Sequence, residues 1–329
     1  MVGIAVFGAG RIGRIHAKNL HQHVDADVLC IVDVDANAAK ELASACNAVV
    51  ASVGDALADP QVDAVVIASA TDTHIDLICS AAAAGKAIFC EKPLALDIDR
   101  AIEGLATVTE HGVLLCIGFN RRHDPSFRRL KQEIDAGTVG AVEFVGITSR
   151  DPSPPPLEYV RRSGGIFRDM MIHDFDMARW LLAEEPVEIY TTGSVLVDPA
   201  IGDAGDIDSA VAVLKTASGK LCQISNSRRC SYGYDQRIEV FGSLGMVQAG
   251  NRSATEVETA GSSGFLRKPV LPFFLERYAD AYRDQLDRFL RVVAGAEIDL
   301  PDGNDGLRAL EIAEAAQRSL ESGAPVSLV

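Results

Sequence analysis

The sequence predicts an α/β protein in two parts: a doubly wound parallel sheet, followed by an α+β region with a large, mostly antiparallel, open sheet. From Val2 to Phe119, short apolar runs alternate with helical patterns without interruption, which is the β-α-β rhythm of a parallel sheet. After a helix expected at 125–136, segments of alternating apolar and polar residues follow, separated by turn residues, as in antiparallel sheets. We therefore expect one domain at residues 1–119 and a second at residues 120–329.

The composition narrows the classes of partner. The 329 residues include 46 acidic and 31 basic side chains, which gives a formal net charge of -15. Such a field repels phosphate backbones and anionic lipid, so we expect neither nucleic acid nor a membrane as a partner. No basic leader precedes the first apolar strand, and no apolar run reaches membrane-spanning length, so we expect a cytoplasmic protein. The cysteines form no cluster with metal-ligand spacing, so we expect no metal.

A glycine-rich loop follows the first predicted strand, with the sequence Gly8-Ala9-Gly10-Arg11-Ile12-Gly13. Its spacing has a mechanical explanation: Gly8 permits the tight turn, Gly10 lets the backbone approach a pyrophosphate, and Gly13 lets the following helix pack closely on the strand. The anion would sit at the helix N-terminus, and we place Arg11 and Ile12 in the same cofactor site. The loop therefore predicts a dinucleotide-binding domain of the Rossmann type.

The second apolar run, Val28–Val32, ends in Asp33. Asp33 follows Gly13 by about 20 positions, the interval at which an acidic residue hydrogen-bonds the ribose hydroxyls of the adenosine. A carboxylate there would repel the 2′-phosphate of NADP, and the neighbouring Val34 offers that phosphate no donor, so the predicted cofactor is NAD. The alternative is that Asp33 is a turn residue that opens the helix expected at 36–45.

Two further strand ends bring polar groups to the carboxyl edge of the sheet, where ligands bind in open α/β proteins. The strand expected at 62–68 is followed by residues that we assign to the cofactor site: Ser69, Ala70, Thr71 and His74. The next strand delivers Glu91 and Lys92 to the same site, because Pro93 cannot continue the ladder. The donors of Lys92 can reach a substrate hydroxyl and a cofactor group together. The alternatives are a solvated Lys92 and, for His74, a helix cap or a packed ring.

A helix expected at 168–182 carries Asp169 and His173. These residues are four positions apart, which places their side chains on one helix face. A carboxylate that holds an imidazole can fix its tautomer and raise its basicity, as a general base for an alcohol requires. The alternative is a surface pair without chemistry, but the dinucleotide domain and the upstream glycine pair favour a catalytic role.

Three segments together resemble the Gfo/Idh/MocA oxidoreductase family, over essentially the whole chain. They are Gly8–Gly13, Glu91-Lys92-Pro93 and Gly164-Gly165-Ile166-Phe167-Arg168-Asp169-Met170-Met171-Ile172-His173-Asp174-Phe175-Asp176. The resemblance implies an NAD-dependent dehydrogenase in which hydride leaves a substrate alcohol carbon for the nicotinamide. It also implies that His173 takes the hydroxyl proton, that Asp169 orients His173 and relays the proton, and that Lys92 hydrogen-bonds the reacting oxygen, without a metal.

Within that family, the segments Thr148–Pro152 and Tyr232–Arg237 are most similar to the inositol dehydrogenases. The resemblance implies a polyol substrate, with oxidation of a ring hydroxyl of myo-inositol to the ketone. Because a polyol requires many hydrogen bonds, the candidate substrate-binding residues are polar. Besides Lys92, Asp169 and His173, they are Asn120, Arg121, Asp151, Asp176 and Tyr234.

Other functions stay open at the level of sequence. A related sugar, aldose or dihydrodiol dehydrogenase would use the same catalytic residues. A silent NAD-sensing regulator would need the glycine-rich loop and Asp33 but not Lys92, Asp169 and His173 together. A glycosidase that uses NAD transiently would release a free sugar without net reduction of NAD. Because an open sheet needs a covering face, we expect a homo-oligomer with two-fold symmetry, either a dimer or a tetramer. The resemblance favours the tetramer.

Overall fold

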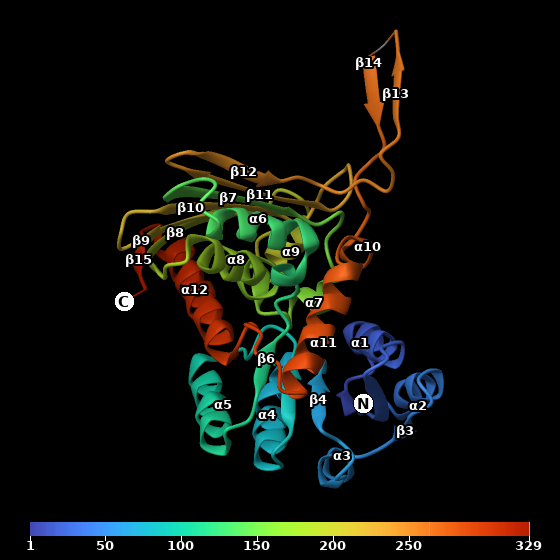
Figure 1. Cartoon of the computed structure of the whole chain (residues 1–329). Helices are drawn as coiled ribbons and strands as arrows, with labels where there is room; N and C mark the ends of the chain where they lie inside the picture. The colour runs from blue at the N-terminus through green and yellow to red at the C-terminus, as the bar shows by residue number, and fades with distance from the viewer. Residues whose placement is uncertain (263, 329) are drawn as a thin grey trace. The chain divides into compact units, whose positions relative to one another are not determined.

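The computed structural model describes residues 1–262 and 264–328, which form two compact units (Figure 1). The first unit contains residues 1–123 and 281–310, and the second contains residues 124–280 and the chain from 311 onward. The sequence predicts a contiguous second domain over 120–329, whereas the contacts group 281–310 with the first unit. The chain therefore returns to its N-terminal unit after building most of the second.

Six parallel strands form the sheet of the first unit, in the order β3-β2-β1-β4-β5-β6. They are β1 (Val2–Phe7), β2 (Ala26–Val32), β3 (Val49–Val50), β4 (Ala64–Ile67), β5 (Ala87–Cys90) and β6 (Leu115–Ile117). This order confirms the predicted doubly wound sheet. The order reverses between β1 and β4, and in such sheets the crevice at the carboxyl ends of those strands is where a dinucleotide binds.

The helices that connect these strands are α1 (Arg11–His21), α2 (Ala36–Ala45), α3 (Val53–Ala58), η1 (Thr71–Thr73), α4 (His74–Ala83) and α5 (Ile98–His111). After β6 come η2 (Asn120–His123) and, much later in the chain, the returning α11 (Ala279–Val293). Local side chains define several of their ends. Asp35 caps α2 and Asp97 caps α5 by accepting backbone N–H bonds, and Gly112 ends α5 in the left-handed conformation at φ +63°.

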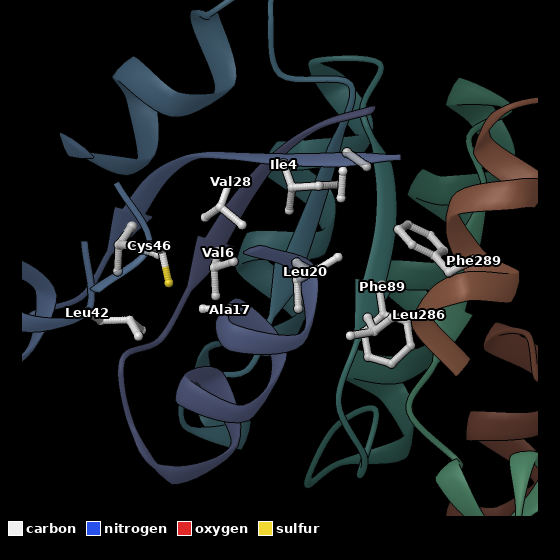
Figure 2. Close-up of a cluster of buried hydrophobic side chains, with 14 of the residues drawn as sticks. Ile4, Val6, Ala17, Leu20, Val28, Leu42, Cys46, Phe89, Leu286 and Phe289 are labelled. Carbon is white, nitrogen blue, oxygen red and sulfur yellow. The ribbon is translucent and has the colours of Figure 1, made fainter. Parts of the chain in front are cut away.

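The core of the first unit explains why α11 belongs to it. Leu286 and Phe289 of α11 are buried in the same apolar cluster as Val6 of β1, Leu20 of α1 and Phe89 of β5 (Figure 2). The rings of Phe89 and Phe289 meet edge to face, with centroids 5.7 Å apart. Burying each large apolar side chain stabilises the folded state by about 1.5–3 kcal/mol. This burial explains why α11, although distant in sequence, packs in the core of the first unit.

Seven strands form the sheet of the second unit, in the order β12-β11-β7-β10-β9-β8-β15. They are β7 (Val142–Arg150), β8 (Pro186–Ser194), β9 (Ser209–Thr216), β10 (Leu221–Ser227), β11 (Asp235–Gly242), β12 (Gly245–Ala249) and β15 (Val326–Ser327). Only the β7–β10 pair among these described strands is parallel, so the prediction of a mostly antiparallel sheet is confirmed. Helices α6 (Pro125–Asp135) and α8 (Ile172–Leu182) lie on one face of this sheet (Figure 1).

The opposite face of this sheet carries exposed apolar side chains. Tyr190 and Val213 are register partners on β8 and β9, and they are 40% and 39% exposed. The alternation of buried and exposed residues along both strands places one row in the core and this row outside.

Short elements complete the second unit. They are α7 (Leu157–Val160), the π-helical turn η3 (Phe167–Met171), α9 (Pro199–Asp203), the hairpin β13 (Glu258–Gly261) and β14 (Gly264–Arg267), α10 (Phe274–Arg277) and the C-terminal part of α12 (Gly303–Ser322). The hairpin extends away from the rest of its unit (Figure 1). None of the described helices has the length and apolar character needed to cross a lipid bilayer.

Candidate active site

The glycine-rich loop joins β1 to α1 as a tight turn. Gly8 has φ +110°, and a Cβ there would lie 2.5 Å from the backbone oxygen of Ala68 on the neighbouring strand segment. A Cβ on Gly13 would lie 1.9 Å from the oxygen of Gly8. By contrast, a Cβ on Gly10 would have no heavy atom of the described residues within 4 Å apart from its chain neighbours. Gly8 and Gly13 are therefore required for packing, whereas the space beside Gly10 is open for a ligand.

The N-terminus of α1 suits a pyrophosphate. Gly10 is the N-cap residue and no side chain caps the helix, so no described side chain occupies the first N–H groups of α1. Arg11 is exposed and Ile12 is half-buried at this end of the helix. An uncapped helix N-terminus with an open approach at Gly10 is the arrangement that binds the phosphates of a dinucleotide.

Asp33 lies just after β2 and accepts a hydrogen bond from the glycine-rich loop. Its Oδ2 accepts a hydrogen bond from the N–H of Ala9 at 2.5 Å, and its Oδ1 accepts from the N–H of Asp35 at 2.7 Å. The second bond places Asp33 in the turn before α2, as the structural alternative expects, while Asp35 is the residue that caps α2. Each carboxylate oxygen still has a second lone pair, so these bonds leave acceptors for ribose hydroxyls.

The segment after β4 forms a small hydrogen-bonded turn that leads into α4. The hydroxyls of Ser69 and Thr73 are 2.7 Å apart, and the Thr73 hydroxyl donates to the carbonyl of Ala70 at 2.7 Å. His74 is 1% exposed, with Nδ1 2.9 Å from the carbonyl of Pro93 and Nε2 3.3 Å from that of Ser69. Burial lowers the pKa of His74, and the two carbonyls oppose that shift.

The ring of His74 is therefore packed between the turn after β4 and the segment after β5, and its two nitrogens contact a carbonyl of each. The half-buried Thr71 belongs to η1 in the same turn. This arrangement agrees with the packed-ring alternative for His74, and a direct contact between His74 and the cofactor stays a prediction.

Glu91 faces inward from the end of β5. It is 8% exposed, and its Oε1 is 2.6 Å from Nε2 of His16, a fully buried residue of α1. A Cβ on Gly118 would lie 2.9 Å from the Glu91 carboxylate, so the glycine leaves room for it. The contact between Glu91 and His16 thus links the end of β5 to α1, the helix after the glycine-rich loop. The half-buried Lys92 directly follows Glu91 at this strand end.

The end of β6 leads into η2, which contains two of the predicted substrate-binding residues. Asn120 and Arg121 are 3% and 4% exposed. The Oδ1 atom of Asn120 is buried and accepts no hydrogen bond from the described residues. Since a buried amide oxygen without a donor is uncommon, this atom is available for a hydroxyl donor.

In the second unit, Asp169 lies within the π-helical turn η3, and His173 follows in the first turn of α8. The sequence predicts one regular helix from 168, whereas a wider π turn starts it, a feature that is frequent at functional sites. Asp169 Oδ1 accepts from the Tyr159 hydroxyl at 2.8 Å, and Oδ2 accepts from Arg228 Nη1 at 3.2 Å. His173 is half-buried.

Sequence reasoning missed Tyr159, Arg228 and Asp206. Arg228 is 1% exposed and donates to Asp206 Oδ2 at 3.3 Å as well as to Asp169. Desolvation of the Tyr159 hydroxyl, together with the adjacent Asp169 carboxylate, raises the pKa of Tyr159. No local pattern marks these residues, because Tyr159 lies in α7, Asp206 follows α9 and Arg228 follows β10.

The remaining predicted substrate residues lie at separate places in the second unit. Asp151 directly follows β7 and is half-buried, and its N–H donates to the carbonyl of Ser227 at 2.9 Å. Asp176 is fully buried in α8. The Tyr234 ring is 7% exposed and meets the rings of Phe273 and Tyr278 edge to face. Their roles toward a substrate stay predictions.

Comparison with known proteins identifies the class. Residues 2–119 match the family model described as an oxidoreductase family with an NAD-binding Rossmann fold, and residues 127–248 match the GFO/IDH/MocA C-terminal domain. The chain belongs to the Gfo/Idh/MocA oxidoreductase family. It is thus an NAD-dependent oxidoreductase, and the open approach at Gly10, the uncapped α1 and Asp33 fit that cofactor.

Individual relatives are similar over their full length. The chain is 51% identical to inositol 2-dehydrogenase of Rhizobium meliloti, covering 99% of each chain. It is 47% identical to myo-inositol 2-dehydrogenase of Thermotoga maritima, covering 99% of this chain and 98% of the relative. Among solved structures, scyllo-inositol dehydrogenase of Lactobacillus casei with bound NAD(H) and scyllo-inositol superposes with a TM-score of 0.93 at 27% identity, covering 100% of this chain and 99% of that one.

Proposed function

We propose that the chain oxidises a ring hydroxyl of a cyclic polyol, with myo-inositol as substrate and the corresponding inosose as product. The observation that carries this proposal is the 51% identity over 99% of both chains with a protein named inositol 2-dehydrogenase. The presence of Lys92, Asp169 and His173 supports a catalytic protein over a silent NAD-binding regulator. When bound, NAD supplies the nicotinamide that accepts the hydride.

The proposed chemistry assigns one task to each of these side chains. The half-buried His173 takes the proton of the reacting hydroxyl as general base. Asp169, which accepts hydrogen bonds from Tyr159 and Arg228, stabilises the protonated imidazole. The ammonium group of Lys92 donates a hydrogen bond to the reacting oxygen and stabilises its developing negative charge.

The proposed substrate pocket is polar. The buried Oδ1 of Asn120, which accepts no hydrogen bond from the described residues, supplies an acceptor for ring hydroxyls, and Arg121 supplies donors. Asp151, Asp176 and Tyr234 are proposed to bind the remaining hydroxyls. A ring that carries a hydroxyl on every carbon can satisfy each of these groups, whereas an apolar alcohol would leave them without partners.

A substrate screen tests the proposal directly. The purified protein is incubated with NAD and myo-inositol, scyllo-inositol, chiro-inositol or glucose, and NADH formation is followed by absorbance. We expect the highest kcat/KM with myo-inositol. Binding of NAD without NADH formation from any of these substrates would favour the regulator, and release of free sugar from a glycoside without net NADH would favour the glycosidase.

Replacing the proposed base tests the mechanism. We expect His173→Ala to lower kcat by roughly 10²–10⁴-fold, the usual contribution of a positioned general base, while the dissociation constant for NAD stays near the wild-type value. The matched control is His111→Ala, at an exposed position at the end of α5. Near-normal turnover of His173→Ala would remove this residue from the chemistry, and a loss of NAD affinity would make it a structural residue instead.

A further inference from the structure

Arg228 is a fully buried charge that two carboxylates share. Its side chain is 1% exposed, Nη1 is 3.2 Å from Asp169 Oδ2, and Nη2 is 3.3 Å from Asp206 Oδ2. A buried guanidinium requires compensating charge, and its planar fork of donors can bond two carboxylates at once. Because both of its terminal nitrogens are engaged, the position of Arg228 depends on Asp206 as well as on Asp169.

Asp206 is itself held by the glycine turn that precedes η3. Its second oxygen, Oδ1, accepts a hydrogen bond from the N–H of Ile166 at 3.0 Å. Gly165, at φ +82°, lies so close that a Cβ there would be 3.0 Å from the same oxygen. Asp206 therefore links the backbone just before the π turn to Arg228. Arg228 in turn donates to Asp169, which lies within that turn.

We propose that Asp206 and Arg228 are positioning residues for the dehydrogenase reaction: Asp206 holds the Arg228 guanidinium in place, and Arg228 holds the Asp169 carboxylate beside the His173 segment. This inference rests on the proposed function, because it acts through Asp169. It explains why the buried residue at this position is a forked cation: it must bond two carboxylates from separate segments of the chain.

The test compares steady-state kinetics with NAD binding. We expect Asp206→Asn and Arg228→Gln each to lower kcat by roughly 10–100-fold, the value of a hydrogen bond to a charged group, with an unchanged dissociation constant for NAD. Asp203→Asn is the matched control, because Asp203 is exposed and ends the helix just before Asp206. Circular dichroism and thermal melting show whether each variant is folded.

The double variant Asp206→Asn/Arg228→Gln tests the order of dependence. If Asp206 acts through Arg228, the double variant loses no more kcat than Arg228→Gln alone; losses that multiply would overturn the inference. Arg228→Lys keeps the charge but lacks the fork, so its kcat should lie between those of wild type and Arg228→Gln. An equal loss in Arg228→Lys and Arg228→Gln would show that the fork is needed and not charge alone, whereas wild-type kcat in Arg228→Lys would overturn the role of the fork.

Asp169→Asn separates the two proposals. If Asp169→Asn turns over normally, the catalytic role in the proposed function fails. If Asp169→Asn is slow while Asp206→Asn and Arg228→Gln are normal, only the positioning inference fails.

Discussion

The second and third glycines of the loop after β1, Gly10 and Gly13, should have different effects when each is changed to alanine. A Cβ on Gly13 would lie 1.9 Å from the backbone oxygen of Gly8, more than 1 Å inside the 3.0 Å that real Cβ atoms respect. The helix must move away from the strand, and overpacking of this kind costs about 1–3 kcal/mol. We therefore expect Gly13→Ala to lower both the free energy of unfolding and the affinity for NAD.

Gly10→Ala should leave the folded protein almost unchanged. Gly10 has φ -70° and ψ -169°, which an alanine adopts without strain. Apart from the chain neighbours, no atom in the part of the chain that the structure describes lies within 4 Å of the new Cβ. The methyl group instead occupies the space through which a pyrophosphate approaches the N-terminus of α1. If that clash costs about 1–3 kcal/mol, the dissociation constant for NAD rises by about 5- to 150-fold.

Urea denaturation gives the free energy of unfolding, and isothermal titration calorimetry gives the affinity for NAD. Gly54→Ala in α3 is the control, because its new Cβ would have no neighbour closer than 3.9 Å. Wild-type NAD affinity in Gly10→Ala would refute the assignment of the pyrophosphate to this helix end. Wild-type stability in Gly13→Ala would refute the packing argument.

Three further predictions concern the cofactor, the first-unit core and assembly. Asp33→Ala should raise the Michaelis constant for NAD and reduce the preference for NAD over NADP. Equal use of NAD and NADP by the unmodified protein would contradict the argument that the Asp33 carboxylate repels the 2′-phosphate. Glu91→Ala should lower the free energy of unfolding by about 1–3 kcal/mol, because it leaves the buried His16 Nε2 without its partner; an unchanged urea midpoint would count against this. The exposed face around Tyr190 and Val213 should be covered by a second subunit, so light scattering should give a dimer or tetramer that Val213→Asp dissociates, and a single 35.0 kDa species would end that prediction.

The features of the fold that depend on neighbouring residues can be predicted from the sequence alone. A local pattern predicts the strand, the glycine turn and the helix at Val2–His21. Hydrophobic periodicity and the left-handed conformation of a glycine each depend on only a few neighbouring residues. The doubly wound sheet follows from the uninterrupted alternation of strands and helices, and its order confirms that prediction. The alternating segments of the second part predict a mostly antiparallel sheet, and β9 (Ser209–Thr216) shows that alternation of buried and exposed residues. The alternation does not mark the short strand β12, since five residues give too little period to recognise.

Which distant groups meet depends on how the whole chain packs. Amphipathic periodicity shows that α11 buries one face, but not that the face covers Phe89 of the first unit. Similarly, no pattern links Tyr159, Asp206 and Arg228 to Asp169, because each is an ordinary polar residue in its own segment. The physical reason is that periodicity reports how much of an element is buried, whereas the partner depends on how the whole chain packs and on which buried charges must be compensated.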